Sequence, residues 1–251
     1  LLAGTTVKSA SIHNSEEMER LNLHEGDYVR IEKGGDIIPK ITSVVLEKRA
    51  ADAQPIQFIT HCPFCGTELV KEEGEANHFC PNAEGCPPQI KGRIQHFASR
   101  KAMDIDGLGA EIVNQLVDEK LIQNYADLYV LTYEDLIQLE RFADLSARNL
   151  LTGIKESKKK PFNKVLYSLG IRYVGETVAK KLARHFCSID SLNQADAETL
   201  SGVPDIGLRI AESVIHFFEQ PENQQIIQSL QQAGLRFSFT GKSPSSGQLN
   251  G

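Results

Sequence analysis

The chain has 251 residues, of which 41% are apolar and 24% are charged, a composition typical of soluble globular proteins. No apolar run approaches the roughly 18 residues that a membrane-spanning helix needs, and we expect neither a transmembrane segment nor a secretory signal. The 27 basic and 33 acidic residues give a net charge of −6, which argues against a protein that coats nucleic acid by bulk charge. Residues 155–184 depart from this balance, because they hold nine basic and two acidic residues, a local net charge of +7. Such a stretch is typical of a nucleic-acid contact, or of a solvated helix face or linker.

The first 60 residues are rich in β-branched side chains and predict a small strand-rich domain. Glycines at 26, 34 and 35 separate the runs. Pro39 lies inside the third run and favours an edge strand or a bulge, because proline donates no hydrogen bond to a sheet. The predicted strands are Thr5–Ile12, Tyr28–Glu32 and Ile37–Leu46.

Four of the five cysteines form a cluster with the spacing Cys-x2-Cys-x14-Cys-x5-Cys, at Cys62, Cys65, Cys80 and Cys86. Four thiolates close a tetrahedral shell around Zn²⁺ and leave no position for a water, so the spacing predicts a structural and not a catalytic zinc site. A segment of about thirty residues with so few apolar side chains needs metal binding in order to fold. Three alternatives to this site remain: His61 or His78 replaces one of the cysteine ligands, the cysteines form a disulfide, or the thiols are free. The fifth cysteine, Cys187, is expected to be a buried free thiol. One tight cluster plus one spare thiol suits a metal site better than a set of disulfides, and this indicates a reducing compartment.

Residues 91–237 are predicted to be helical and contain a fourfold repeat. Each copy is a turn that has an apolar residue, two variable residues, an apolar residue and then glycine or alanine. The last residues of the copies fall at positions 109, 143, 175 and 207, so the period is 32 to 34 residues. Each turn opens an amphipathic helix, with its inward-facing residues three, four, seven and eight positions later. The four turns are Ile105–Gly109, Leu139–Ala143, Ile171–Gly175 and Val203–Gly207.

An apolar-x-Gly-apolar-Gly turn between two helices is the helix-hairpin-helix signature. The helix that follows exposes backbone N–H groups without a partner inside the helix, and its dipole adds positive potential. Such donors suit the phosphates of DNA, which carry no sequence information. A single copy is more simply an ordinary αα-hairpin, but four copies at near-constant spacing favour phosphate binding. The predicted contacts are Gly107, Gly109, Gly175 and Gly207, whereas the second turn has no glycine and is expected to be a packing hairpin.

The order of these parts resembles the C-terminal half of the bacterial NAD⁺-dependent DNA ligases. The residues that carry the resemblance are 4–7, 11–14 and 35–40 (Gly-Asp-Ile-Ile-Pro-Lys) in the first domain, 62–66 and 86–89 around the cysteines, and 96–109 before the first hairpin. The resemblance implies a multidomain α+β protein. Its parts are an OB-fold β-barrel over 1–60, a four-cysteine zinc finger over 61–90, an all-α domain of four helix-hairpin-helix repeats over 91–237, and a polar linker over 238–251 toward a BRCT domain that this sequence lacks.

The resemblance also implies a function, because the family seals single-strand nicks in duplex DNA during replication and repair. It joins a 5′-phosphate to a 3′-hydroxyl by way of AMP, which a lysine takes from NAD⁺. The family's Lys-x-Asp-Gly motif occurs nowhere in this sequence, so we expect the chain to bind nicked duplex DNA without sealing it. NAD⁺ and Mg²⁺ are expected only with the missing adenylation domain. The OB domain would press on the minor groove through Thr6, Lys8, His13 and Asn14, and the protein would be a monomer in the bacterial cytoplasm.

Two other classes of function are weighed against this one. The first is a non-catalytic helix-hairpin-helix module of a repair or recombination factor, and the Gly-Asp-Ile-Ile-Pro segment argues against it. The second is a zinc-stabilised scaffold for protein interactions, which failure to bind duplex DNA would favour.

Overall fold

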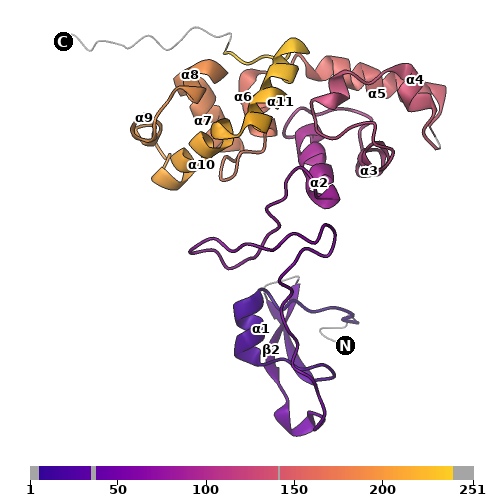
Figure 1. Ribbon diagram of the computed structural model, residues 1–251, viewed down its shortest axis with the longest axis vertical. Coiled ribbons are helices and arrows are strands. Elements are labelled where there is room, and N and C mark those ends of the chain that lie inside the picture. Colours follow the sequence, from indigo (N-terminus) through magenta and orange to yellow (C-terminus); the bar gives the residue numbers. More distant parts are fainter. Residues whose placement is uncertain (1–5, 35–37, 141, 240–251) are drawn as a thin grey trace. The chain divides into compact units, whose positions relative to one another are not determined.

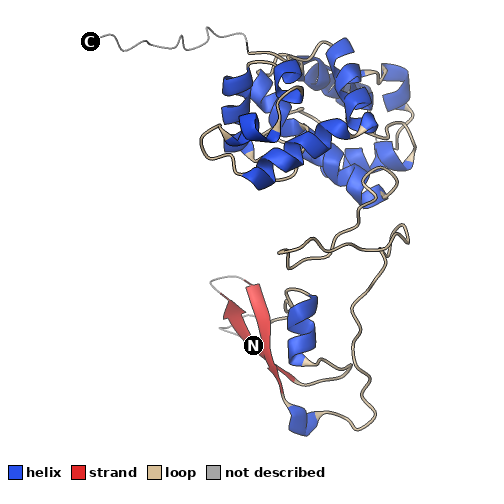
Figure 2. Cartoon of the chain, turned by 60° about the vertical axis from the view of Figure 1, so that its left-hand side comes forward, coloured by secondary structure: helices blue, strands red, loops and turns tan. Residues whose placement is uncertain are grey.

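The computed structural model describes residues 6–34, 38–140 and 142–239 (Figure 1). The chain divides into two compact units, Leu1–Cys86 and Pro87–Gly251. The described strands are confined to the first unit, and the second is built from helices and loops (Figure 2). The sequence-predicted motif at 35–40 lies partly outside the described residues, as do the start of the predicted first strand, Arg141 of the second turn and most of the predicted linker at 238–251.

The first unit holds a short helix packed on a two-stranded antiparallel sheet. Helix α1 (Ser15–Leu21) precedes strands β1 (Val29–Gly34) and β2 (Ile38–Val44), and the 3₁₀ helix η1 (Leu46–Lys48) follows them. The register shifts between Arg30 and Ile31, which pair with Ser43 and Ile41, so Thr42 is the extra residue of a β-bulge in β2. The small core consists of Met18, Leu21 and Leu23 with Ile12, Val29, Ile41, Val44 and Phe58 packed against it.

The two later strand predictions are confirmed within the described residues, but the first is wrong. Within the described residues 6–12 only Ser11 pairs, through a single parallel bridge to Lys40. β-branched composition is a weak predictor here, because strand formation depends on packing against a partner strand. Asn14 then caps helix α1 by accepting a hydrogen bond from the Glu17 amide at 2.9 Å.

A salt bridge joins the residues just before β1 and just after η1. The Asp27 carboxylate, 2% exposed, receives hydrogen bonds from two nitrogens of the Arg49 guanidinium, each at 2.8 Å. Because the pair is fork-to-fork, its geometry is fixed as well as its charge. The hydrogen bond from Arg49 lowers the pKa of Asp27.

The second unit is a set of helices around one extended core. Its elements are α2 (Pro87–Ala98), α3 (Ala110–Asp118), η2 (Asp127–Tyr129), α4 (Tyr133–Ile137), α5 (Asp144–Ser157), α6 (Phe162–Ser168), α7 (Glu176–Phe186), α8 (Ile189–Asn193), α9 (Ala197–Ser201), α10 (Leu208–Glu219) and α11 (Pro221–Gln232). The helix pairs α2/α3, α4/α5, α6/α7 and α9/α10 are in contact, and each flanks one of the four predicted turns. The fourfold repeat is therefore a set of four helical hairpins.

The predicted inward positions four and seven residues after each turn are buried in all four hairpins, whereas position three is half-buried or, at Ser146, exposed. Four residues after the last turn residue, Val113, Ala147, Ala179 and Ala211 are all 0% exposed. The three alanines leave room for the partner helix, since a small side chain at a helix contact allows close approach. Cys187 departs from the prediction. It is only half-buried, because it forms the left-handed C-cap of α7 with φ 61°.

None of the described helices combines the length and the apolar character that a membrane crossing requires.

Candidate metal centre and nucleic-acid interface

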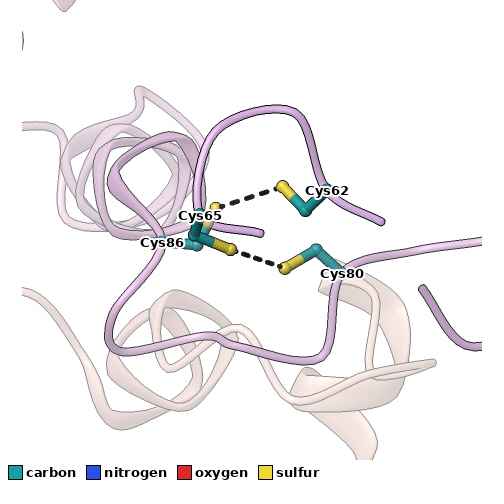
Figure 3. Close-up of side chains that lie close together, drawn as sticks. All are labelled: Cys62, Cys65, Cys80 and Cys86. Atoms are coloured by element: carbon teal, nitrogen blue, oxygen red, sulfur yellow. Dashed lines mark hydrogen bonds between the residues drawn. The ribbon is translucent and has the colours of Figure 1, made fainter. Parts of the chain in front are cut away.

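The four clustered cysteines point toward one another in the first unit (Figure 3). Their sulfurs all lie within 4.8 Å of one another, with Cys62 and Cys86 Sγ 3.8 Å apart and Cys65 and Cys80 Sγ 3.5 Å apart. A tetrahedral zinc ion with Zn–S bonds of ~2.3 Å requires sulfurs about 3.8 Å apart, so the cluster fits that ion. The thiols are not joined as disulfides.

Two backbone turns hold the sulfurs in place. After the first pair, the amide of Gly66 donates to the carbonyl of Cys62 at 2.9 Å, and Gly66 takes a left-handed φ of 71°. Before the last cysteine, Asn82 Oδ1 accepts from the Gly85 amide at 2.8 Å. A side chain at Gly66 would be strained in this conformation, which explains the glycine that follows the first pair.

The surroundings of the sulfurs act on their pKa values in opposite directions. Hydrogen bonding with Thr67 lowers the pKa of Cys65 to about 6, whereas burial raises the pKa of Cys80. A thiolate already present at neutral pH provides a first anchor for a divalent metal.

The two histidines considered as alternative ligands lie outside the sulfur cluster in the described structure. The His61 Nδ1 atom is 2.9 Å from Thr60 Oγ1, and the His78 ring packs against Phe58 with centroids 4.7 Å apart. The geometry therefore favours four thiolates over a mixed set.

The four hairpin turns share one hydrogen-bond frame. In each, the amide of the second apolar residue donates to the carbonyl of the first, at 3.3 Å for Leu108, 3.2 Å for Phe142 and 3.0 Å for both Val174 and Ile206. The last turn residue then accepts the first bond of the following helix, from Val113, Ala147, Ala179 and Ala211. Sequence spacing alone predicted this equivalence, and the backbone confirms it.

The last glycines of the first, third and fourth turns face open space. Gly109, Gly175 and Gly207 are exposed N-cap residues of α3, α7 and α10, with φ between −82° and −72° and no side-chain cap. A Cβ built on any of the three meets no atom within 4 Å. Neither backbone conformation nor internal packing requires glycine here. The bare surface leaves the amides at the helix starts open to an external group, which is what a phosphate needs.

Gly107 has a different reason to be glycine. Its φ is +80°, and a Cβ would lie 3.5 Å from the Leu150 backbone, so it faces helix α5. Its amide lies 3.1 Å from the carboxylate of Asp106. The same third turn position is left-handed at Tyr173 (φ 63°) and Asp205 (φ 66°), so the turn shape persists without glycine.

The candidate contacts of the first unit all precede α1 in the sequence. Thr6, Lys8 and His13 are exposed, and His13 has a left-handed φ of 66°. Asn14 is half-buried and serves as the N-cap of α1. Its side-chain oxygen is therefore engaged within the fold.

Three of the nine basic residues in the stretch 155–184 pair with acids in or next to the hairpin turns, which sequence reasoning missed. The pairs are Lys160 with Asp104 (2.9 Å), Lys164 with Glu176 (2.7 Å), and Lys181 with Asp205. Hydrogen bonds from Lys160 and Lys164 lower the pKa values of Asp104 and Glu176 respectively. The ammonium groups thus lie at the turns, where a phosphate would compete with the carboxylates.

Comparison with known proteins identifies all three parts. Residues 1–53 match the NAD-dependent DNA ligase OB-fold domain, residues 61–87 the NAD-dependent DNA ligase C4 zinc finger domain, and residues 164–227 the helix-hairpin-helix motif. The chain carries domains of the NAD-dependent DNA ligases. The predicted OB fold, zinc finger and helical hairpins of this ligase region are therefore confirmed.

Proteins that align with nearly the whole of this chain are DNA ligases. The chain is 58% identical over 236 residues to a DNA ligase of Flavobacterium johnsoniae, 55% over 239 residues to one of Cytophaga hutchinsonii, and 48% over 235 residues to one of Porphyromonas gingivalis. These alignments cover 94–95% of this chain and 35–36% of each relative. The chain thus spans about a third of the length of these curated ligases.

Proposed function

We propose that this chain is the DNA-binding part of an NAD⁺-dependent DNA ligase that seals single-strand nicks in duplex DNA during replication and repair. The observation that carries the proposal is the set of three exposed, unpacked N-cap glycines in ligase-type hairpins. These glycines leave the surface at the helix starts uncovered on a protein whose net charge is −6. Neutral amides bind phosphate without requiring a basic surface, so the acidic composition and DNA binding are compatible.

In this proposal the chain divides into an OB domain (1–60), a zinc finger (61–90), four helix-hairpin-helix repeats (91–237) and a linker (238–251). Zn²⁺ is held by Cys62, Cys65, Cys80 and Cys86 and closes the 61–90 segment structurally. The ion supplies no chemistry to the sealing reaction, since four thiolates leave no open coordination position.

The DNA contacts fall in two groups. Gly109, Gly175 and Gly207 offer backbone amides to phosphates, and Gly107 shapes the first turn beside them. In the OB domain, Thr6, Lys8 and His13 are exposed and available for the DNA backbone, with Asn14 holding the adjacent helix start.

The chain is proposed to bind a nick without sealing it. It contains no Lys-x-Asp-Gly motif, so the transfer of AMP from NAD⁺, and the Mg²⁺ that accompanies it, require an adenylation domain outside this sequence. The proposed setting is the bacterial cytoplasm, and the proposed binding species is a monomer on nicked duplex DNA.

The direct test incubates the purified chain with a fluorescent duplex that carries one 5′-phosphorylated nick. We expect a rise in fluorescence anisotropy on binding, no joined strand on a denaturing gel, and no labelled protein after incubation with NAD⁺ radiolabelled in its AMP half. Self-adenylation or strand joining would overturn the inactive-fragment proposal, and absence of duplex binding at low salt would overturn the DNA-binding role.

The alternative of a non-catalytic helix-hairpin-helix module from another repair factor is disfavoured. The helix-hairpin-helix motif alone is compatible with it, but the OB and zinc-finger matches are specific to NAD-dependent DNA ligases.

A further inference from the structure

The third hairpin turn carries an aromatic residue where the hairpin signature has its first glycine. Tyr173 takes a left-handed φ of 63°, which is an uncommon conformation for a bulky side chain. Glycine would adopt it at no steric cost, so the turn itself gives no reason for a tyrosine. A residue kept in a disfavoured conformation points to a role for its side chain.

Two arginines from different hairpins meet at this ring. The guanidinium carbon of Arg209, in α10 of the fourth hairpin, lies 4.4 Å from the ring centroid, and that of Arg172, in the third turn, lies 5.0 Å from it. Arg209 also donates a hydrogen bond from Nη2 to the Tyr173 hydroxyl at 2.8 Å. The Ser213 hydroxyl donates to the Arg172 carbonyl at 2.7 Å, which fastens the third turn to α10. The ring is half-buried, while both arginines are exposed.

This arrangement places two guanidinium groups against one aromatic ring. A guanidinium can stack on an aromatic ring and still present N–H groups to a phosphate, because its charge and donors are spread over a plane. A side chain that is already held in place also loses less conformational freedom when it binds.

We propose that Tyr173 is a positioning residue that holds Arg172 and Arg209 as one phosphate-binding site for the DNA backbone, shared by the third and fourth hairpins. The site rests on the proposed DNA-binding function and adds a cationic grip to the neutral amides of the hairpin turns. Tyr173 acts through the two arginines and carries no charge of its own.

The test measures the salt dependence of binding to a labelled nicked duplex between about 50 and 200 mM NaCl, since each phosphate neutralised by a cation contributes about 0.9 to the slope of log K against log salt. We expect Arg172→Ala and Arg209→Ala each to lower that slope by up to about 0.9. Tyr173→Gly is expected to lower it as well, although it removes no charge and relieves the left-handed backbone. In an Arg172→Ala/Arg209→Ala background, Tyr173→Gly should change nothing further.

A matched control is Tyr133→Leu, because Tyr133 stacks with Arg148 (5.2 Å) in the second hairpin, whose turn has no glycine. Its slope should equal that of the original chain. Tyr173→Phe keeps the ring but loses the hydroxyl, so its slope should fall between those of the original chain and Tyr173→Gly. It also serves as the deciding variant if thermal melting shows that Tyr173→Gly is unfolded.

A wild-type slope in folded Tyr173→Gly, or for Tyr173→Phe if the glycine variant unfolds, would overturn the inference while the chain still binds DNA. The same follows if Tyr173→Gly has an undiminished effect in the background that lacks both arginines. Failure of the original chain to bind duplex DNA would instead overturn the proposed function itself.

Discussion

Among the described glycines of the helical unit, Gly153 has the least space for a side chain. It lies inside α5, where a Cβ would come within 2.4 Å of the Asp106 carbonyl oxygen in the first hairpin turn. Alanine would improve helix propensity by about 1 kcal/mol, but forcing a methyl against a backbone oxygen costs about 1–3 kcal/mol or more. We therefore expect Gly153→Ala to lower the free energy of unfolding by roughly 1–2 kcal/mol in a urea titration.

Gly92 provides the matched control, because it is also a helix-interior glycine, in α2, and a Cβ there meets nothing within 4 Å. Gly92→Ala should raise the free energy of unfolding by about 0.5–1 kcal/mol. Equal effects of the two substitutions would contradict the view that the close approach to Asp106 decides the cost.

The sequence does not predict the close contact of Gly153, because that contact is made with a residue far away in the chain. A lone glycine in a helical pattern signals a reason for glycine, but the partner of Gly153 belongs to a distant turn. The left-handed backbone at Tyr173 and Asp205 was equally hidden, because a bulky residue such as tyrosine rarely adopts it and an aspartate alone does not signal it. In contrast, the exposed glycines at 109, 175 and 207 were predicted from spacing alone.

At the scale of elements, serine substitution separates hairpins that bind phosphate from those that only pack. A serine N-cap accepts a hydrogen bond from the N2 or N3 amide, so Gly109→Ser should keep or improve stability while occupying a donor that the phosphate needs. We expect weaker DNA binding, to the same extent on duplexes of different sequence, by anisotropy titration. Unchanged affinity would argue against an amide grip in the first hairpin.

The second hairpin offers the control within the same repeat. Ala143 is the N-cap of α5 and also lacks a side-chain cap, so Ala143→Ser should stabilise the protein by about 0.5–1 kcal/mol. If this turn is a packing hairpin, DNA affinity should not change. An equal loss of affinity in both serine variants would show that the second turn binds phosphate as well.

The zinc finger is the element whose fold depends most on a bound ion, because its own buried cluster consists of three cysteines with Cys65 and Leu69 against them. Elemental analysis should give about one zinc per chain, with the metal supplying most of the folding free energy of this segment.

Cys80→Ser should lose the zinc and expose the segment to protease, while Cys187→Ser should keep both the zinc and the protection. Acid should release the zinc, because protons compete with it for the thiolates. Full zinc content in Cys80→Ser would contradict a four-thiolate site.

The elements with a repeated or chemically constrained signal were the ones that the sequence predicted well. Cysteine spacing identified the metal centre, and the 32–34-residue period identified the hairpins, because ligand geometry and helix packing each fix residue type at fixed intervals. The first strand prediction was wrong, since β-branched composition alone does not show whether a segment finds a partner strand. The pairing of the lysines with these acids also escaped prediction, because the partners are 12 to 56 residues apart in the sequence.

At the scale of the whole molecule, the proposed function requires a protein with an excess of acidic residues to hold a polyanion. Backbone amides neutralise no charge and so release few counterions, whereas arginine and lysine contacts release about 0.9 each. We therefore expect the measured salt slope to be smaller than about 0.9 times the number of phosphates in contact. Ethylation interference on a labelled duplex counts those phosphates, and a salt titration of the same complex gives the slope. The slope that remains should come largely from Arg172 and Arg209. A slope that matches the full phosphate count would mean that lysine side chains, released from their turn carboxylates, carry the binding in place of the amides.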